Sequence, residues 1–373
     1  MALILSEEQK MLKDSAKEFL AINAPVDQFR NLRDNNYQPF DHELWKEIVE
    51  MGWTALTFPE QYNGLDFGYV GLGQVLEEMG RNLTKAPLFS SIVLGGTSLM
   101  HSTNEELKSK WIPALINGEK RIAFAQDEKS YFNPDEVATT AKKTTDGYVI
   151  NGTKRMVIDG KGADAFLIIA SNENNEKELF LVASNHPGIT LDTDIFLDAG
   201  TYATLNLKEV TISKEQRVSE EGKGNELINL VNNIAAIGLS AEMLGMMKEA
   251  FEQTINYIRE RQQFGKRIGS YQALQHRAAK LFCEIELCKS VVINGLQGID
   301  TKAENLDELA SLAKAKLGET LKMVTNEAMQ MHGGIGVTDD VNIGFYFKRA
   351  RVAQQLFGDY NYHLDKYAKL NSY

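Results

Sequence analysis

Two segments of the chain combine residue types that suit phosphate recognition. The first runs from Arg261 to Gly265, and the second, about 65 residues later, runs from Gln330 to Gly336. An arginine side chain carries a fork of donors that matches phosphate oxygens in a bidentate way. Gly333 and Gly334 would stop a helix, and without Cβ atoms they would also let the backbone approach a ligand closely. Taken alone, a solvated arginine followed by a helix cap explains the first segment equally well.

One carboxylate is notable for its surroundings. Glu242 lies in an otherwise apolar helical stripe, where an unpaired charge would be costly to bury. This position favours a functional role for the Glu242 side chain, but a buried structural salt bridge would explain it equally well. His332, in the second segment, is interpreted as a packing or hydrogen-bonding residue rather than a catalyst. Cys283 and Cys288 lie five residues apart, which suits neither a metal site nor a disulfide framework, so we expect no metal and reduced thiols in a cytosolic protein.

The overall composition limits the possible partners. The length of 373 residues indicates two or three domains, and the 43% hydrophobic and 24% charged shares are typical of a globular protein. No apolar run approaches the roughly 20 residues needed to span a bilayer, so membrane insertion is not expected. The net charge of −11 argues against nucleic acid as the main partner. It still allows an anionic ligand, because local basic groups and backbone N–H groups can hold phosphates.

The pattern of apolar residues changes twice along the chain. Residues 1–120 have helical spacing of apolar residues, with Gly80 as a candidate C-cap. Residues 121–220 contain short apolar runs, and the turn dipeptide Asp146-Gly147 predicts an antiparallel, barrel-like β-domain. Residues 221–373 contain long helical stripes that suit a four-helix bundle. We therefore expect an α+β multidomain chain with an N-terminal helical domain, a central antiparallel β-domain and a C-terminal four-helix bundle. This order alone allows many functions.

With this domain order, the two segments resemble signatures of the acyl-CoA dehydrogenase family, and the similarity covers nearly the whole chain. The stretches Trp45 to Trp53, Leu76 to Gly80 and Asp146 to Lys154 are also similar to that family. Tyr131 to Ala141 and Gly344 to Arg349 resemble the small subunit of pimeloyl-CoA dehydrogenase and its bacterial relatives. The resemblance implies FAD as cofactor, an acyl-CoA thioester as substrate and electron-transferring flavoprotein as the electron acceptor.

The resemblance also assigns roles within the two segments. Arg261 would contact the flavin pyrophosphate, and Phe264 would pack at the adenine end, with Gln263 in the same cofactor-binding motif. Gln330 and the turn at Gly333 and Gly334 would reach the FAD of a neighbouring subunit. We therefore expect at least a dimer, formed by self-association or with a sister acyl-CoA dehydrogenase subunit.

The β-domain departs from the family pattern beside the flavin ring. Where the family commonly has a Thr-Glu-Pro sequence, the chain aligns Gln126 and the two residues that follow it. Gln126 can both donate and accept a hydrogen bond, so it is a candidate replacement for the threonine. Where the family commonly has Trp-Ile-Thr, the chain has Met156 to Ile158. Met156 can pack on a flavin face through its polarisable sulfur, but the aromatic wall and the hydroxyl are lost.

The family reaction needs a base that the chain lacks at the usual positions. The family removes a proton from Cα and passes a hydride from Cβ to the flavin, which gives a trans-2-enoyl thioester and requires a positioned carboxylate. The two family positions for this glutamate correspond to Ala235 and Phe357. Glu242, about two helical turns after Ala235, and Asp359, two residues after Phe357, are the candidate replacements.

Other interpretations of the missing base stay open. The chain would be a non-catalytic subunit that supports a catalytic sister chain if it has no competent base of its own. A flavin monooxygenase or a nitroalkane oxidase-like enzyme on the same fold is a further interpretation.

Overall fold

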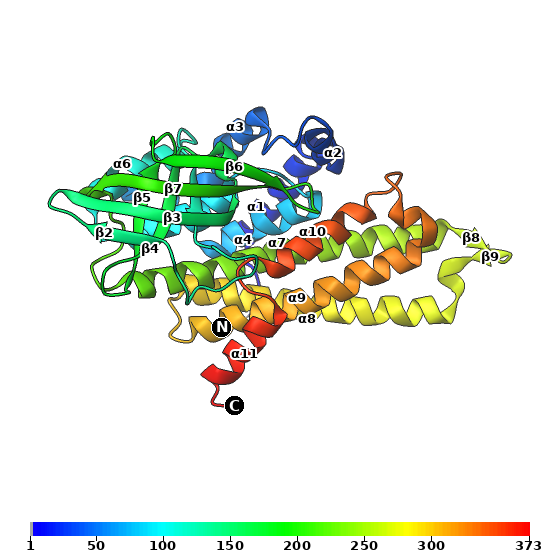
Figure 1. The fold of residues 1–373 in the computed structure, drawn as a ribbon. Helices are drawn as coiled ribbons and strands as arrows, with labels where there is room; N and C mark the ends of the chain where they lie inside the picture. The colour runs from blue at the N-terminus through cyan, green and yellow to red at the C-terminus, as the bar shows by residue number, and fades with distance from the viewer. Residues whose placement is uncertain (1–2) are drawn as a thin grey trace. The chain divides into compact units, whose positions relative to one another are not determined.

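The computed structural model describes residues 3–373, which divide into two compact units (Figure 1). The helical unit comprises residues 3–30, Tyr69–Thr84 and Ala236–Tyr373. The sheet unit comprises Asn31–Gly68 and Lys85–Ala235. These units differ from the three consecutive domains predicted from the sequence, because the N-terminal third contributes two helices to the helical unit and its remaining elements to the sheet unit.

Long helices build the helical unit. Its helices are α1 (Glu7–Asn23), α4 (Tyr69–Asn82), most of α7 (Gly224–Glu260), α8 (Gln272–Asp300), α9 (Leu306–His332), α10 (Ile343–Gln355) and α11 (Tyr360–Leu370), and a hairpin of β8 (Gln262–Gln263) and β9 (Lys266–Arg267) follows α7. Helix α9 packs against α8, α10 and α11, and α4 packs against α1 and α8. A capping box starts α1, since the side chains of Ser6 and Gln9 each accept a hydrogen bond from the backbone N–H of the other.

Two glycines bring α4 and α7 into close contact. A Cβ atom on Gly80 would lie 2.0 Å from the carbonyl oxygen of Glu242, and one on Gly245 would lie 1.7 Å from that of Glu77. Gly80 lies inside α4, two residues before its end, so the prediction that it caps the helix is wrong. The physical reason for a glycine there is close backbone approach.

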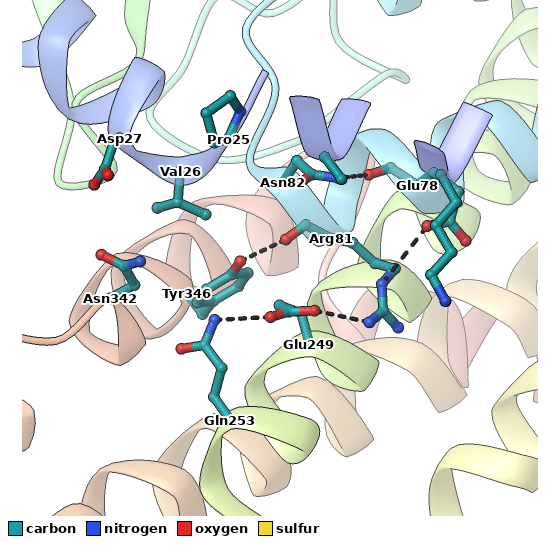
Figure 2. Close-up of a pocket in the computed structure, with 12 residues that line it drawn as sticks. Pro25, Val26, Asp27, Glu78, Arg81, Asn82, Glu249, Gln253, Asn342 and Tyr346 are labelled. Carbon is teal, nitrogen blue, oxygen red and sulfur yellow. Dashed lines mark hydrogen bonds and ion pairs between the residues drawn. The ribbon is translucent and has the colours of Figure 1, made fainter. Parts of the chain in front are cut away.

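The helical unit also contains a cavity of about 340 Å³ lined by residues of α1, α4, α7 and α10 and by Pro25, Val26 and Asp27 (Figure 2). Lys17 and Arg81 are the cations of its lining, and Arg81 forms ion pairs with Glu78, Glu249 and Glu252. The Tyr346 hydroxyl donates to the Arg81 carbonyl oxygen. Because carboxylates already surround the guanidinium, this cavity is poorly suited to a phosphate or carboxylate ligand.

A seven-stranded sheet forms the core of the sheet unit. The strands are β1 (Ile122–Ala125), β2 (Thr140–Lys143), β3 (Gly147–Ile158), β4 (Ala165–Ser171), β5 (Lys177–Ala183), β6 (Ile189–Ile195) and β7 (Thr201–Ser213). They follow the order β1-β4-β2-β3-β7-β6, with β5 paired to β4. The pairs are antiparallel as predicted, except that β4 runs parallel to β1 and to one residue of β2. The chain forms the β2–β3 hairpin between β1 and β4, and such long connections are what parallel pairing requires.

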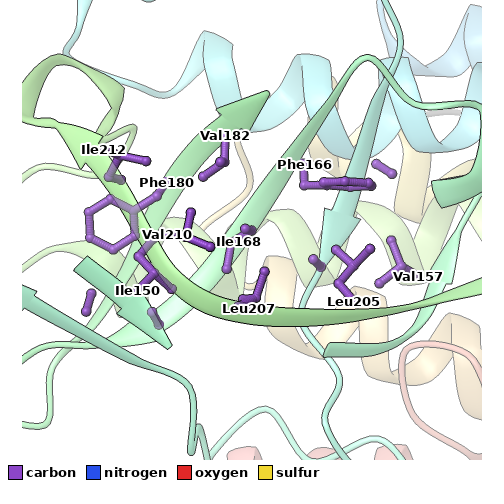
Figure 3. Close-up of a cluster of buried hydrophobic side chains, with 14 of the residues drawn as sticks. Ile150, Val157, Phe166, Ile168, Phe180, Val182, Leu205, Leu207, Val210 and Ile212 are labelled. Atoms are coloured by element: carbon purple, nitrogen blue, oxygen red, sulfur yellow. The ribbon is translucent and has the colours of Figure 1, made fainter. Parts of the chain in front are cut away.

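The sheet unit also contains several helices. The sheet unit contains α3 (His42–Glu50), the π-helix η3 (Phe89–Gly96), α5 (Thr97–Met100) and α6 (Glu105–Ile116), whereas α2 (Val26–Asp34) crosses the boundary between the units. Side chains from several strands meet in one buried apolar cluster (Figure 3). Tyr148 and Phe180 pack within it with ring centroids 4.9 Å apart. The predicted turn at Asp146-Gly147 does join two antiparallel strands, β2 and β3.

Helix α7 is apolar over much of its length. Within residues 3–373 it is the one helix whose length and composition would allow it to cross a membrane. However, 78% of its most apolar window of 18 residues is buried inside the protein, as in the core helix of a globular fold.

Candidate functional site

An irregularity in β3 contains Met156, one of the predicted flavin residues, and a second, Ile158, lies at the end of the same strand. The register of β3 against β7 shifts between Lys154 and Val157. Met156, inside this irregularity, has a φ of 53°, in the left-handed region that a methionine rarely adopts. Ile158 ends the strand, and both it and Met156 are half-buried. Bulges re-aim side chains and are common beside functional sites, so the local backbone favours a role for Met156.

A polar cluster lies just after β1. Gln126 is 7% exposed, and its Oε1 accepts a hydrogen bond of 2.9 Å from Asn232 Nδ2. Three side-chain atoms at this place are among the buried atoms without a hydrogen-bond partner in the described residues: Gln126 Nε2, Asn232 Oδ1 and Asp127 Oδ1. We call these three residues the amide–carboxyl cluster. Buried polar atoms are rarely left unpaired, so the cluster fits the polar edge of a bound ring system such as that of FAD.

Charged groups surround Asp127. Burial raises the pKa of Asp127 to about 6, and the nearby Glu128 carboxylate raises it further. The Gln126 side chain and the Lys154 charge lower it, but they do not outweigh burial. Lys154 is fully buried, and its Nζ donates to Glu128 Oε1 at 2.6 Å and to the Gln126 carbonyl oxygen at 3.1 Å. Burial lowers the pKa of Lys154 to about 8 despite the nearby Glu128 carboxylate.

A polar cavity of about 560 Å³ opens beside Glu128. Arg155 lines it together with Asp192, so both signs of charge are present. The Thr139 hydroxyl, also on its wall, is buried and has no hydrogen-bond partner in the described part of the chain. The cavity can therefore hold a polar group, but its charges do not select an anion.

The first sequence segment forms an exposed hairpin in the helical unit. Arg261 follows α7 directly, and β8 and β9 pair on either side of a turn made by Phe264 and Gly265. Both turn residues have positive φ, 53° and 80°, as tight hairpin turns require. Phe264 is 89% exposed, Arg261 and Gln263 are also exposed, and Arg261 forms no ion pair within the described chain. An exposed aromatic ring on strained backbone favours a docking role.

The second segment forms the end of α9. Gln330, Gly333 and Gly334 are exposed, and a Cβ atom on either glycine would meet nothing within 4 Å. The protein's own packing therefore leaves this backbone accessible, as the cofactor prediction requires. His332 stacks on Tyr257 with centroids 4.5 Å apart, and its Nδ1 lies 2.8 Å from a carbonyl oxygen of its own helix. Burial lowers the pKa of His332, and these contacts favour the packing interpretation.

Both candidate bases are engaged by other groups. Arg349 donates to Glu242 Oε1 from Nη2 at 2.8 Å and from Nε at 3.1 Å, which is the salt bridge that the sequence left open. Asp359 is the N-cap of α11, and its Oδ1 accepts from the Tyr362 N–H at 2.9 Å. These contacts fix the positions of the two carboxylates, but they do not show which of them is a catalytic base.

Two buried side chains hold the turn at Phe357, where the family keeps a glutamate. Lys314 Nζ donates to the carbonyl oxygens of Gly358 at 2.8 Å and Gln354 at 3.1 Å. His363 Nε2 donates to the Phe357 carbonyl oxygen at 2.7 Å. Burial lowers the pKa of Lys314 to about 7 and that of His363 to about 3. Neither residue was predicted from the sequence, although a lysine within the apolar stripe of α9 is a usable signal.

Two domain models of one protein family match most of the chain. Residues 6–119 match the model of the acyl-CoA dehydrogenase N-terminal domain, and residues 222–370 match that of the C-terminal domain. The chain is 25% identical over 361 residues to the 3-(aryl)acrylate reductase of Clostridium sporogenes, covering 94% of both chains. It is 24% identical over 360 residues to the caffeyl-CoA reductase-Etf complex subunit CarC of Acetobacterium woodii, again covering 94% of both.

A solved structure shares the fold over the whole chain. Butyryl-CoA dehydrogenase from Megasphaera elsdenii superposes with a TM-score of 0.92 at 22% identity, covering 100% of both chains. This likeness confirms the predicted fold class of helical, sheet and helical regions. Because the two family models together match more than half of the chain, the protein belongs to the acyl-CoA dehydrogenase family and is an FAD-dependent oxidoreductase.

Proposed function

We propose that the protein oxidises the Cα–Cβ bond of an acyl-CoA thioester to the trans-2-enoyl-CoA. The amide–carboxyl cluster carries this proposal, because its unpartnered buried donor and acceptors suit the polar edge of the flavin ring. Bound FAD supplies the hydride acceptor. In this proposal Met156 packs on the flavin and Ile158 lies nearby. Arg261, Gln263 and Phe264 bind the rest of the cofactor.

Proton removal from Cα is assigned to Glu242 in this proposal. Arg349 holds its carboxylate at a fixed position, and a positioned carboxylate is what the α-proton requires. Asp359 is the second candidate, and its carboxylate would have to leave the α11 cap to reach a substrate. Gln330, Gly333 and Gly334 are proposed to contact the FAD of a second subunit, as in the family.

The acyl group and the electron partner belong to the proposal as well. The resemblance to the pimeloyl-CoA dehydrogenase small subunit suggests dicarboxylyl, branched or steroid side-chain thioesters. One relative is named as part of an Etf complex, which supports electron-transferring flavoprotein as the partner. Two relatives are named as reductases, so assays have to run in both directions. Cys283 and Cys288 are free thiols, which is compatible with the proposed cytosolic location.

The test is to record the visible flavin spectrum anaerobically while acyl-CoA thioesters are added to the chain alone. Bleaching by one thioester supports the dehydrogenase proposal and identifies the acyl class. Glu242→Gln should then abolish bleaching, whereas Glu286→Gln, on the half-exposed side of α8, should leave it unchanged. Bleaching that survives Glu242→Gln but not Asp359→Asn would move the base to Asp359.

A second candidate function is that of a non-catalytic subunit. The observations behind this candidate are Ala235 and Phe357 at the usual base positions and the contacts that already engage Glu242 and Asp359. In that case no thioester bleaches the flavin of the chain alone, and bleaching appears only after a catalytic sister chain is added.

A further inference from the structure

We propose that Asp127 is a proton-linked carboxyl group that contacts the flavin ring and sets its reduction potential. This role goes beyond the proposed reaction, and it rests on FAD as the cofactor rather than on any substrate or catalytic base.

The geometry places Asp127 beside the residues predicted to meet the flavin. It directly follows Gln126, and its carbonyl oxygen accepts a hydrogen bond of 2.6 Å from the N–H of Arg155. This bond ties the segment after β1 to the bulge of β3, one residue before Met156. The carboxyl oxygen Oδ1 is buried and has no hydrogen-bond partner among the described residues.

The cluster is complementary to the pyrimidine edge of a flavin, which alternates carbonyl acceptors with one N–H donor. Gln126 Nε2 is an unpaired donor and Asn232 Oδ1 an unpaired acceptor, and their mutual hydrogen bond fixes the two amides side by side. Asp127 adds the one titratable group of the set. Its carboxyl group can accept a hydrogen bond when ionised and can also donate one when protonated.

The Gln126 side chain and the Lys154 charge both act to lower the pKa of Asp127, but they do not cancel the effect of burial. Lys154 is a buried cation whose charge acts on Asp127, but its Nζ is already bonded to Glu128 and to the Gln126 carbonyl oxygen. The Arg155 side chain is exposed on the same strand. Burial is the main cause that raises the pKa of Asp127 to about 6, so the charge of its carboxyl group changes at a pH close to neutrality.

The direction of the effect follows from charge. An ionised carboxylate beside the ring disfavours the addition of electrons and lowers the potential. Protonation removes this penalty, so the potential should rise by an extra amount as the pH falls through the pKa of Asp127. By the same linkage, reduction of the flavin should raise the pKa of Asp127.

The experiment is a dye-coupled titration of the flavin with a chemical reductant, at pH values on both sides of the Asp127 pKa. No acyl-CoA is present, so failure of the proposed reaction does not affect the result. The wild type should show an extra inflection in potential against pH that free FAD lacks. Asp127→Asn should raise the potential on the alkaline side and remove the inflection. Asp127→Glu, which keeps a titratable group, should retain an inflection.

Asp164→Asn is the matched control. Asp164 also lies in the sheet unit, where it pairs with Arg121, and this variant should follow the wild type. A wild-type curve without the inflection overturns the proposal, and this result needs no variant to fold. An Asp127→Asn protein that keeps the wild-type curve overturns it equally.

Discussion

At the scale of single residues, Lys154 and Glu128 form a buried ion pair in the sheet unit. The Lys154 side chain is fully buried and that of Glu128 is 12% exposed. Removing one partner of such a pair leaves the other charge uncompensated, so Lys154→Met should lower the free energy of unfolding by about 3 kcal/mol. The urea midpoint, followed by circular dichroism, measures this change.

The control for this prediction is Lys143→Met. Lys143 pairs with Glu221 at the surface, with exposures of 54% and 59%, so its loss should change stability by less than about 1 kcal/mol. Adding Glu128→Gln to Lys154→Met should recover part of the lost stability. Equal midpoints for the two single variants would show that the buried pair is not structurally important.

Some residues of the proposed cofactor site could be predicted from the sequence and others could not, for a physical reason. Arg261, Gly333 and Gly334 could be proposed because their expected chemistry depends on residue type and local backbone. Asp127 and Asn232 were not, because their importance comes from unpaired atoms that only the tertiary fold brings together. A single sequence gives no measure of burial for either side chain.

At the scale of elements, the crossing of α4 and α7 depends on glycine. A Cβ atom at position 245 would lie 1.7 Å from a backbone oxygen of α4, so the two helices would have to separate. We expect Gly245→Ala to destabilise the protein by about 1–3 kcal/mol through overpacking. Thermal unfolding of the purified variant measures the loss.

Gly318 provides the opposite case on α9. A Cβ atom there would meet nothing within 4 Å, so Gly318→Ala should stabilise the helix by about 0.5–1 kcal/mol. The same substitution should thus act with opposite sign at two helical positions. If both variants lose stability to the same extent, close approach of α4 and α7 is not the reason for Gly245.

The turn before α11 should make stability depend on pH. Burial, reinforced by the Lys314 charge, lowers the pKa of His363 from 6.5 to about 3. Between these two values the unfolded chain binds a proton that the folded chain does not, so stability should fall as the pH drops through this range. Urea midpoints at several pH values in this window would show the trend.

The variant for this test is His363→Gln, whose amide can still donate to the Phe357 carbonyl oxygen. It should flatten the acid side of the stability profile, whereas His276→Gln, at an exposed position of α8, should leave that side unchanged. A profile as steep as that of the wild type would assign acid sensitivity to other groups.

At the scale of the whole molecule, the predicted order of helical, sheet and helical regions was correct, but it did not give the compact units. Apolar periodicity identifies a helix and its buried face, as in α1 and α4. It does not say which distant segment covers that face. Both helices pack in the unit that contains α8 and α9, a long-range arrangement that local sequence patterns cannot encode.

Two of the residues proposed to bind FAD are exposed in the protomer. Phe264 is 89% exposed and Gln330 is also exposed, so neither stabilises the protomer that carries it. If they bind FAD within an oligomer, sedimentation velocity of the FAD-bound protein should give at least twice the protomer mass. Phe264→Ser should then weaken FAD binding at least tenfold, a loss of about 1.4 kcal/mol, without changing the urea midpoint of the apoprotein.

The control is Met11→Ser. Met11 is also an exposed hydrophobic residue, 71% exposed on α1, so its substitution should change neither FAD affinity nor the urea midpoint. A monomer at every concentration, with unchanged FAD affinity in Phe264→Ser, would contradict the role of this hairpin in a shared cofactor site.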